Sequence, residues 1–187
     1  MGALPGARAA ARPARVLVGA WVPTSGTVRL DNMALSEWEA EDRGRHVGGR
    51  TIMWGRQSYR WSPMDFEANA KDGIAVDWPI RYDDLAPWYD HVESFIGVSG
   101  QAEGVPVLPD GKFLPPMEFN CVEKDFKKVL ADKFGRLMTI GRVANMTRAQ
   151  NGRSACQFRN QCARGCSYGA YFSTQSSTLP AAAKTGR

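Results

Sequence analysis

The clearest pattern in the chain is a row of apolar positions spaced three or four residues apart, as on one face of a helix. The row lies within residues 83–96 and consists of Leu85, Trp88, Tyr89, Val92, Phe95 and Ile96. Asp83 and Asp84 precede it, and acidic side chains there face the positive end of a helix. Gly97 follows and ends the pattern. The sequence therefore predicts a helix over residues 83–96.

The same spacing predicts a second helix over residues 123–134. Its apolar face would consist of Val122, Phe126, Val129, Leu130 and Phe134. Gly135 follows as a stop signal. Further on, apolar and polar residues alternate over residues 137–146, which is the period of a strand. The chain is thus expected to contain strands as well as helices.

Three other regions are assigned from their turn residues. Residues 63–75 carry a proline where the first turn of a short helix would lie, and end at an Asp-Gly turn signal. Residues 101–116 are rich in proline and glycine and are predicted to be a loop. Asn151-Gly152 suits a turn, residues 156–169 are expected to be irregular, and residues 173–183 are predicted to form the last helix.

A glycine pair in residues 46–56, which read HVGGRTIMWGR, is the best candidate for chemistry. Gly48 and Gly49 have no Cβ, so both can adopt φ > 0 and let backbone N–H groups approach a bulky ligand. The alternative is a plain tight turn, because paired glycines are common in loops.

Composition and charge exclude several classes of protein. The 187 residues, 43% of them hydrophobic and 23% charged, suit one ordinary soluble domain, or one domain with a tail. The net charge of +5 is dispersed, apart from arginines among the first 15 residues, and forms no basic stripe for nucleic acid. No apolar stretch approaches the roughly 20 residues of a membrane span.

The four cysteines leave several possibilities open. Cys156, Cys162 and Cys166 have the spacing C-x5-C-x3-C, which is unlike common zinc motifs, and Cys121 lies far from them. A metal site, a disulfide between two of the three, and packed or free thiols all remain. Neither histidine lies in the sequence context of a nucleophilic triad, which argues against a hydrolase.

Three ordered blocks carry a family resemblance. They read VGGRTIMWGR, DWPIRYDDLAPWYDHVE and CARGCSYGAYFSTQSSTLPAAAKTG. In this order they resemble the glucose-methanol-choline (GMC) oxidoreductases, particularly the bacterial sugar-dehydrogenase branch. The resemblance covers residues 44–187. Residues 1–43 are unmatched, differ in composition, and are expected to be poorly ordered.

The resemblance implies an α/β fold, or α+β if the sheet is incomplete, made of part of a FAD-binding domain with cap helices. It implies FAD and oxidation of an alcohol or sugar hydroxyl by hydride transfer to the flavin N5 atom. By position, the implied cofactor-binding residues are Gly48, Gly49, Thr51, Met53, Trp54 and Gly55. Some relatives carry a histidine bonded to FAD at the position of Met53, so methionine implies non-covalent FAD. The late cysteines are implied to be structural, and no metal ligands are assigned.

Two departures from the family suggest an inactive internal fragment. The G-x-G-x-x-G dinucleotide fingerprint is missing from the first residues. The family's histidine-containing catalytic segment would lie beyond Arg187, so no catalytic residue is assigned. The expected partner is a small alcohol or sugar substrate, with no nucleic acid and no membrane span. A possible electron-acceptor subunit is not identified, and the sequence leaves the compartment of this soluble protein open between cytoplasm and periplasm.

Two rival functions come from other classes. The three late cysteines with a histidine could hold zinc in a small module whose basic surplus contacts nucleic acid. The chain could also be a non-catalytic interaction domain that kept the family's shape.

Overall fold

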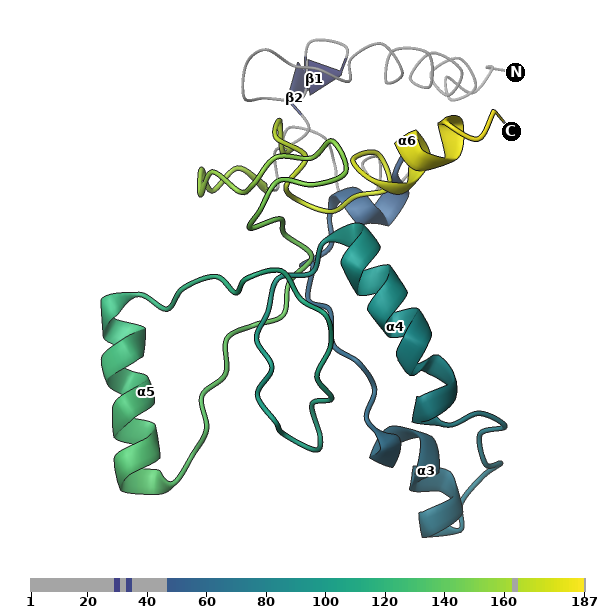
Figure 1. Ribbon diagram of the computed structural model, residues 1–187, viewed down its shortest axis with the longest axis vertical. Coiled ribbons are helices and arrows are strands. Elements are labelled where there is room, and N and C mark those ends of the chain that lie inside the picture. The colour runs from purple at the N-terminus through teal and green to yellow at the C-terminus, as the bar shows by residue number, and fades with distance from the viewer. Residues whose placement is uncertain (1–28, 31–32, 35–46, 163–164, 187) are drawn as a thin grey trace, which may run out of the picture. The chain divides into compact units, whose positions relative to one another are not determined.

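The computed structural model describes residues 29–30, 33–34, 47–162 and 165–186. The chain divides into two compact units, one made of Met1–Gly55 with Gly152–Arg187 and the other of Arg56–Asn151. Figure 1 labels their elements. The prediction about residues 1–43 falls almost wholly outside the described residues. No helix in the described part of the chain is long and apolar enough to cross a membrane.

The first unit contains short elements. Strands β1 (Arg29–Leu30) and β2 (Met33–Ala34) pair antiparallel, with Arg29 opposite Ala34 and Leu30 opposite Met33. The 3-10 helix η2 spans Gly49–Ile52, and helix α6 spans Thr178–Ala183. Among the described residues, 165–177, which precede α6, contribute no helix or strand to this unit.

The second unit contains the three longest helices described, α3 (Pro63–Asp72), α4 (Tyr82–Ile96) and α5 (Cys121–Phe134). They confirm the predictions over 83–96 and 123–134 and the short helix within 63–75. Each helix ends at a glycine in the left-handed conformation, with φ between 58° and 77°. An L-residue with a side chain adopts that conformation only at a cost, so the glycines end the helices.

The described part of the chain is mostly helical with few strands, so the sheet of the expected α/β or α+β fold is not seen there. The prediction of a strand over residues 137–146 was wrong. Val143 forms only isolated antiparallel bridges, to Gln57 and to Ser99. The N–H of Asn145 turns back to the carbonyl of Val143 at 2.7 Å, which ends the extended run.

The last helix is shorter than predicted because serine side chains occupy its expected first turn. The N–H of Ser173 donates to Ser176 Oγ at 3.0 Å, and the N–H of Ser176 donates to Ser173 Oγ at 3.2 Å. Such local bonds offer the backbone an alternative to helical hydrogen bonds. The loop over 101–116, the turn at 151–152 and the irregular described residues of 156–169 are as predicted.

A small apolar core lies in the second unit. Its members are Phe66, Val98, Leu114, Ala144 and Met146, all buried. A Cβ at Gly97 would lie 2.1 Å from Met146 Sδ, so the glycine that ends α4 also makes room for this core. Phe66 additionally packs edge-on against Trp78, at 6.3 Å between ring centroids. Core packing therefore links the end of α4 to the segment around Met146.

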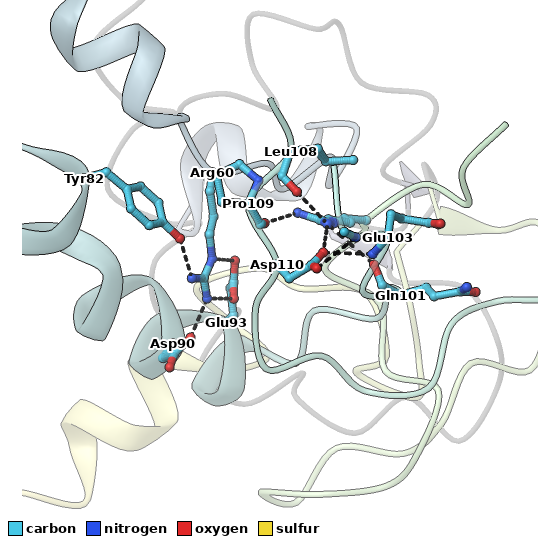
Figure 2. Close-up of polar contacts among 11 residues, drawn as sticks. Arg60, Tyr82, Asp90, Glu93, Gln101, Glu103, Leu108, Pro109 and Asp110 are labelled. Carbon is cyan, nitrogen blue, oxygen red and sulfur yellow. Dashed lines mark hydrogen bonds and ion pairs between the residues drawn. The ribbon is translucent and has the colours of Figure 1, made fainter. Parts of the chain in front are cut away.

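Arg60 forms one buried polar cluster in the second unit (Figure 2). Its Nε donates to Glu93 Oε1 at 2.9 Å, its Nη2 reaches both Glu93 and Asp90 at 2.5 Å, and its Nη1 donates to the hydroxyl of Tyr82 at 3.1 Å. Burial acts to lower the pKa of Arg60, but the bonds to Glu93, Asp90 and Tyr82 outweigh it and raise the pKa. The cluster fixes the segment around Arg60 to α4.

Arg142 fixes the loop over residues 101–113 in a second cluster of the same unit. Figure 2 labels the loop residues of this cluster, among them Leu108, Pro109 and Asp110. It donates to the carbonyls of Leu108 at 3.2 Å and Pro109 at 2.5 Å, and to Asp110 Oδ1 at 2.9 Å. The carboxylate of Asp110 also accepts the N–H groups of Glu103 and Gly104. One arginine from outside the loop therefore satisfies much of its buried backbone.

Candidate functional site

The glycine pair starts the helix η2 in the first unit. Gly48 has φ 101° and Gly49 has φ 50°, which confirms the prediction that these residues use positive φ. The N–H of Thr51 donates to the carbonyl of Gly48 at 3.1 Å, and the Thr51 hydroxyl donates to the same carbonyl. The pair thus makes a tight turn that Thr51 closes. We call residues 47–55 the glycine-pair loop.

Gly48 also has no room for a side chain, because another part of the unit packs against it. A Cβ at this position would lie 3.1 Å from Gln175 Cγ and 3.1 Å from Ile52 Cγ2, closer than side chains ordinarily approach. Gln175 Nε2 donates to the carbonyl of Val47 in the same region. The space that a side chain at Gly48 would take is therefore filled by Gln175 and Ile52. The tight-turn interpretation accounts for a glycine at that position.

Thr51 joins the glycine-pair loop to the segment that precedes α6. The N–H of Thr174 donates to Thr51 Oγ1 at 3.0 Å, and the two threonine hydroxyls lie 3.2 Å apart. The Thr51 hydroxyl is therefore occupied by bonds within the unit. Its role is to hold the loop against residues 171–175.

Trp54 is anchored to the same segment at both its side chain and its backbone. Its indole N–H donates to the carbonyl of Phe172 at 3.0 Å, and the Tyr171 hydroxyl donates to the carbonyl of Trp54 at 2.9 Å. The rings of Trp54 and Phe172 meet edge to face, with centroids 5.8 Å apart and planes at 82°. The half-buried indole is thus held at a fixed angle.

Met53 and Gly55 are both exposed residues of the glycine-pair loop, and we call these two residues its open side. Met53 is 37% exposed, and a Cβ added at Gly55 would meet nothing within 4 Å. Gly55 has no positive φ that would require glycine. The six residues predicted to bind the cofactor therefore fall into two groups. Gly48, Gly49, Thr51 and Trp54 form the turn or contact residues 171–175, whereas Met53 and Gly55 are exposed.

Arg153 supports the segment that holds Trp54. The residue is only 4% exposed; its Nε donates to the carbonyl of Gly169 at 2.7 Å and its Nη2 to that of Ala170 at 3.1 Å. Burial lowers the pKa of Arg153 to about 10. The guanidinium stays protonated at neutral pH and keeps both bonds.

Sequence reasoning missed the partners of the glycine-pair loop. These are Arg153, Tyr171, Phe172, Thr174 and Gln175. A signal was present, because the late block GAYFSTQSS accompanies the VGGRTIMWGR block in the family resemblance. Nothing in either block showed that the two meet.

In the described part of the chain the cysteines are not gathered into the site that the rival zinc module needs, and His46 lies outside that part. All four thiols are free, with Cys121 exposed and the other three half-buried. Among the described residues, no group of three or more His, Cys, Asp and Glu is placed to hold a metal ion. Residues 163 and 164, between Cys162 and Cys166, lie outside the described part.

The glycine-pair loop, including Trp54, is the segment that the family resemblance assigned to flavin binding. The comparisons confirm that resemblance: distant curated homologues of this chain are flavin oxidoreductases of the GMC family, which binds FAD. No family model matches the sequence.

The individual relatives are dehydrogenases and an oxidase. A 2-methyl-1,2-propanediol dehydrogenase of Mycolicibacterium austroafricanum is 33% identical over 115 residues, covering 59% of this chain and 20% of the relative. The fructose dehydrogenase large subunit of Gluconobacter japonicus is 30% identical over 131 residues, or 67% of this chain and 24% of the relative. A paromamine 6'-oxidase of Streptomyces fradiae is 30% identical over 164 residues, or 79% and 29%. The chain spans less than a third of the length of each relative.

Proposed function

We propose that this chain forms part of the flavin-facing region of a FAD-dependent oxidoreductase that acts on CH–OH groups of alcohols or sugars. The homology to GMC oxidoreductases carries the proposal. The relatives are named for 2-methyl-1,2-propanediol, fructose and paromamine. A diol and a sugar both carry hydroxyl groups. The substrate class proposed here is therefore the hydroxyl-bearing small molecule, with no single compound favoured.

The open side of the glycine-pair loop fits a flat ligand. Gly55 leaves more than 4 Å free where a side chain would begin, and Met53 beside it is partly exposed. Trp54, between them, has its N–H engaged by Phe172, so its ring orientation is set before any ligand arrives. Preorganised, partly apolar surface of this kind is common in cofactor sites.

Each residue of the loop has a role in this proposal. Gly48, Gly49 and Thr51 make the turn that presents the loop, and Trp54 braces it. Met53 and Gly55 contact the cofactor, and because a methionine thioether forms no flavin linkage, binding is non-covalent. FAD, when bound, supplies the acceptor for a hydride from the substrate carbon. We propose no catalytic base within this chain, and expect no turnover from it alone, because it spans about a quarter of its relatives.

Flavin binding by the purified chain tests the proposal. We expect FAD to show saturable quenching of its fluorescence on titration with the protein. Gly55→Leu adds an apolar side chain whose Cβ would meet no heavy atom within 4 Å, so it should weaken binding while leaving the fold intact. Ala149→Leu, which adds the same apolar surface at an exposed position of the other unit, is the matched control and should bind FAD as the wild type does.

The two contrary results are distinct. Absence of saturable binding to the folded wild-type chain would show that these residues do not hold FAD. Equal affinity of wild type and Gly55→Leu would show that FAD binds elsewhere. Circular dichroism of each variant establishes that the comparison is made between folded proteins.

A further inference from the structure

Arg153 lies at the base of a chain of contacts that ends at the glycine-pair loop. Its guanidinium donates two bonds along one edge, to the successive carbonyls of Gly169 and Ala170. Its carbon Cζ also lies 5.9 Å from the ring centroid of Phe172. The N–H of the next residue, Ser154, donates to the carbonyl of Tyr168 at 3.0 Å. Arg153 therefore holds the backbone of Gly169 and Ala170 and lies against the ring of Phe172, while Ser154 holds that of Tyr168.

The residues that follow this backbone are those that hold Trp54. Tyr171 donates its hydroxyl to the carbonyl of Trp54, and the carbonyl of Phe172 accepts the indole N–H. Both residues come directly after Ala170, and the side chain of Tyr171 is buried. A displacement of Gly169 and Ala170 would move both partners of Trp54 together.

The two bonds require the shape of arginine. A guanidinium presents parallel N–H groups in a rigid plane, so it can hold two neighbouring carbonyls at once. A lysine ammonium is a point charge on a flexible chain and cannot reproduce that edge. Burying a cation among carbonyls also carries a desolvation cost, seen in the lowered pKa of Arg153, about 10. If this position served only to fill space, an apolar side chain would do so without that desolvation cost.

From these contacts we infer that Arg153 is a positioning residue that sets the orientation of Trp54, and thereby of the open face formed by Met53 and Gly55. The inference rests on the proposed function only in taking that face as the flavin contact. The path Arg153, Gly169–Ala170, Tyr171–Phe172, Trp54 lies wholly inside one unit of the structure.

The test compares Arg153→Lys with Arg142→Lys in the full chain. Arg142 is the matched control because it is equally buried, donates to backbone carbonyls and lies 4.7 Å over the ring of Phe113, but belongs to the other unit. The environment of Trp54 is read without flavin, as the emission spectrum of each protein minus that of the same protein carrying Trp54→Phe. FAD affinity is measured separately by titration.

We expect Arg153→Lys to red-shift the Trp54 difference emission and to increase its quenching by acrylamide, with FAD binding weakened about tenfold. Arg142→Lys should lower stability without changing the Trp54 emission. The inference is overturned if folded Arg153→Lys shows the wild-type Trp54 spectrum, or if both variants shift it equally, since either result would assign Arg153 a general stabilising role.

Tyr171→Phe keeps the test decisive where Arg153→Lys does not fold. It removes only the hydroxyl that donates to Trp54, so it should shift the Trp54 emission in the same direction; an unchanged spectrum would overturn the proposed path. Failure of the proposed function is a separate result, because it would appear as absence of FAD binding in the wild type while the Trp54 spectra still respond to Arg153→Lys.

Discussion

At the scale of single residues, the buried charged side chains of the second unit tolerate few substitutions. The side chain of Arg60 is 3% exposed and that of Glu93 is 7% exposed, and two bonds join them along one guanidinium edge. A desolvated ion is tolerated only when its partners replace water. Removing one member of the pair is therefore more damaging than replacing both.

Glu93→Ala should destabilise the second unit strongly. It leaves the buried guanidinium of Arg60 with its described hydrogen bonds to Asp90 and Tyr82, and loss of one member of a buried pair costs about 3 kcal/mol or more. The measurement is the free energy of unfolding in urea. Glu67→Ala removes one side of an exposed pair with Lys71 and should change stability little. Equal effects of the two variants would contradict the assignment of a buried cluster.

Gly111→Ala should disturb the same cluster from the loop side. A Cβ at Gly111 would lie 2.3 Å from Glu93 Oε2 and 2.5 Å from Arg60 Nη2, so the ion pair or the loop must shift. At Gly141 the nearest atom would be 3.7 Å away, an ordinary contact, which makes Gly141→Ala the control. We expect only the first variant to lower the midpoint of urea unfolding, by a destabilisation of about 1–3 kcal/mol. A lower midpoint for Gly141→Ala alone would refute this account.

The candidate site shows what the sequence could and could not predict at this scale. The positive φ of Gly48 and Gly49 was predictable because only glycine adopts it without strain. The bond from Thr174 to Thr51 was not, because it joins residues 123 positions apart and leaves no periodic signal in either segment. The buried arginines were missed for the same reason: their partners come from distant segments.

At the scale of elements, helices with local signals were predicted and those that depend on side-chain competition were not. The helix α5 has a capping box in which Asn120 accepts from the N–H of Glu123 and Glu123 accepts from the N–H of Asn120. Caps, spacing and terminal glycine are all visible in sequence. The mutual bonds of Ser173 and Ser176, which shorten the last helix, and the turn at Val143, which ends the expected strand, are decided in three dimensions.

The pH dependence of α3 follows from its first turn. The hydroxyl and N–H of Ser62 both donate to Asp65 Oδ2 and lower the pKa of that carboxyl. The stabilisation is therefore present above the unfolded pKa, about 3.9, and is lost as the pH falls through the lower folded pKa. Asp65→Asn should flatten the fall of helix stability between about pH 5 and pH 2, measured by circular dichroism in urea. If Asp65→Asn leaves the fall of stability at low pH unchanged, Asp65 is not the group that causes it.

The helix α5 should depend on its cap more than α3 or α4 does. None of its residues is buried, and Phe126 on its predicted apolar face is 53% exposed. With little tertiary support, local interactions decide its stability. Asn120→Ala should cost the helix about 1 kcal/mol, seen as faster hydrogen exchange of amides within 124–131. Lys128→Ala, at an exposed mid-helix position, should slow exchange slightly or leave it unchanged. Unaltered exchange in Asn120→Ala would mean that other contacts hold α5.

At the scale of the whole molecule, the hydrogen bonds described above for the three buried arginines each lie within one of the two units. The bonds described for Arg60 and Arg142 go to residues of Arg56–Asn151, and those described for Arg153 go to residues of the other unit. Hydrogen bonds between residues of one unit contribute directly to the stability of that unit. Stability changes made in one unit should then stay there.

Thermal denaturation should accordingly show two transitions that respond to different variants. Glu93→Ala should lower only the transition of the second unit, because the cluster of Arg60 lies there. Thr51→Val should lower only the other, because it removes the hydroxyl that accepts from Thr174 and donates to Gly48 while keeping the side-chain volume. The two signals are separable by following Trp54 emission against the helical ellipticity carried mainly by α3, α4 and α5. A single transition that both variants lower by the same amount would show that the two units unfold as one cooperative body, since energy lost in either network would then be felt by the whole chain.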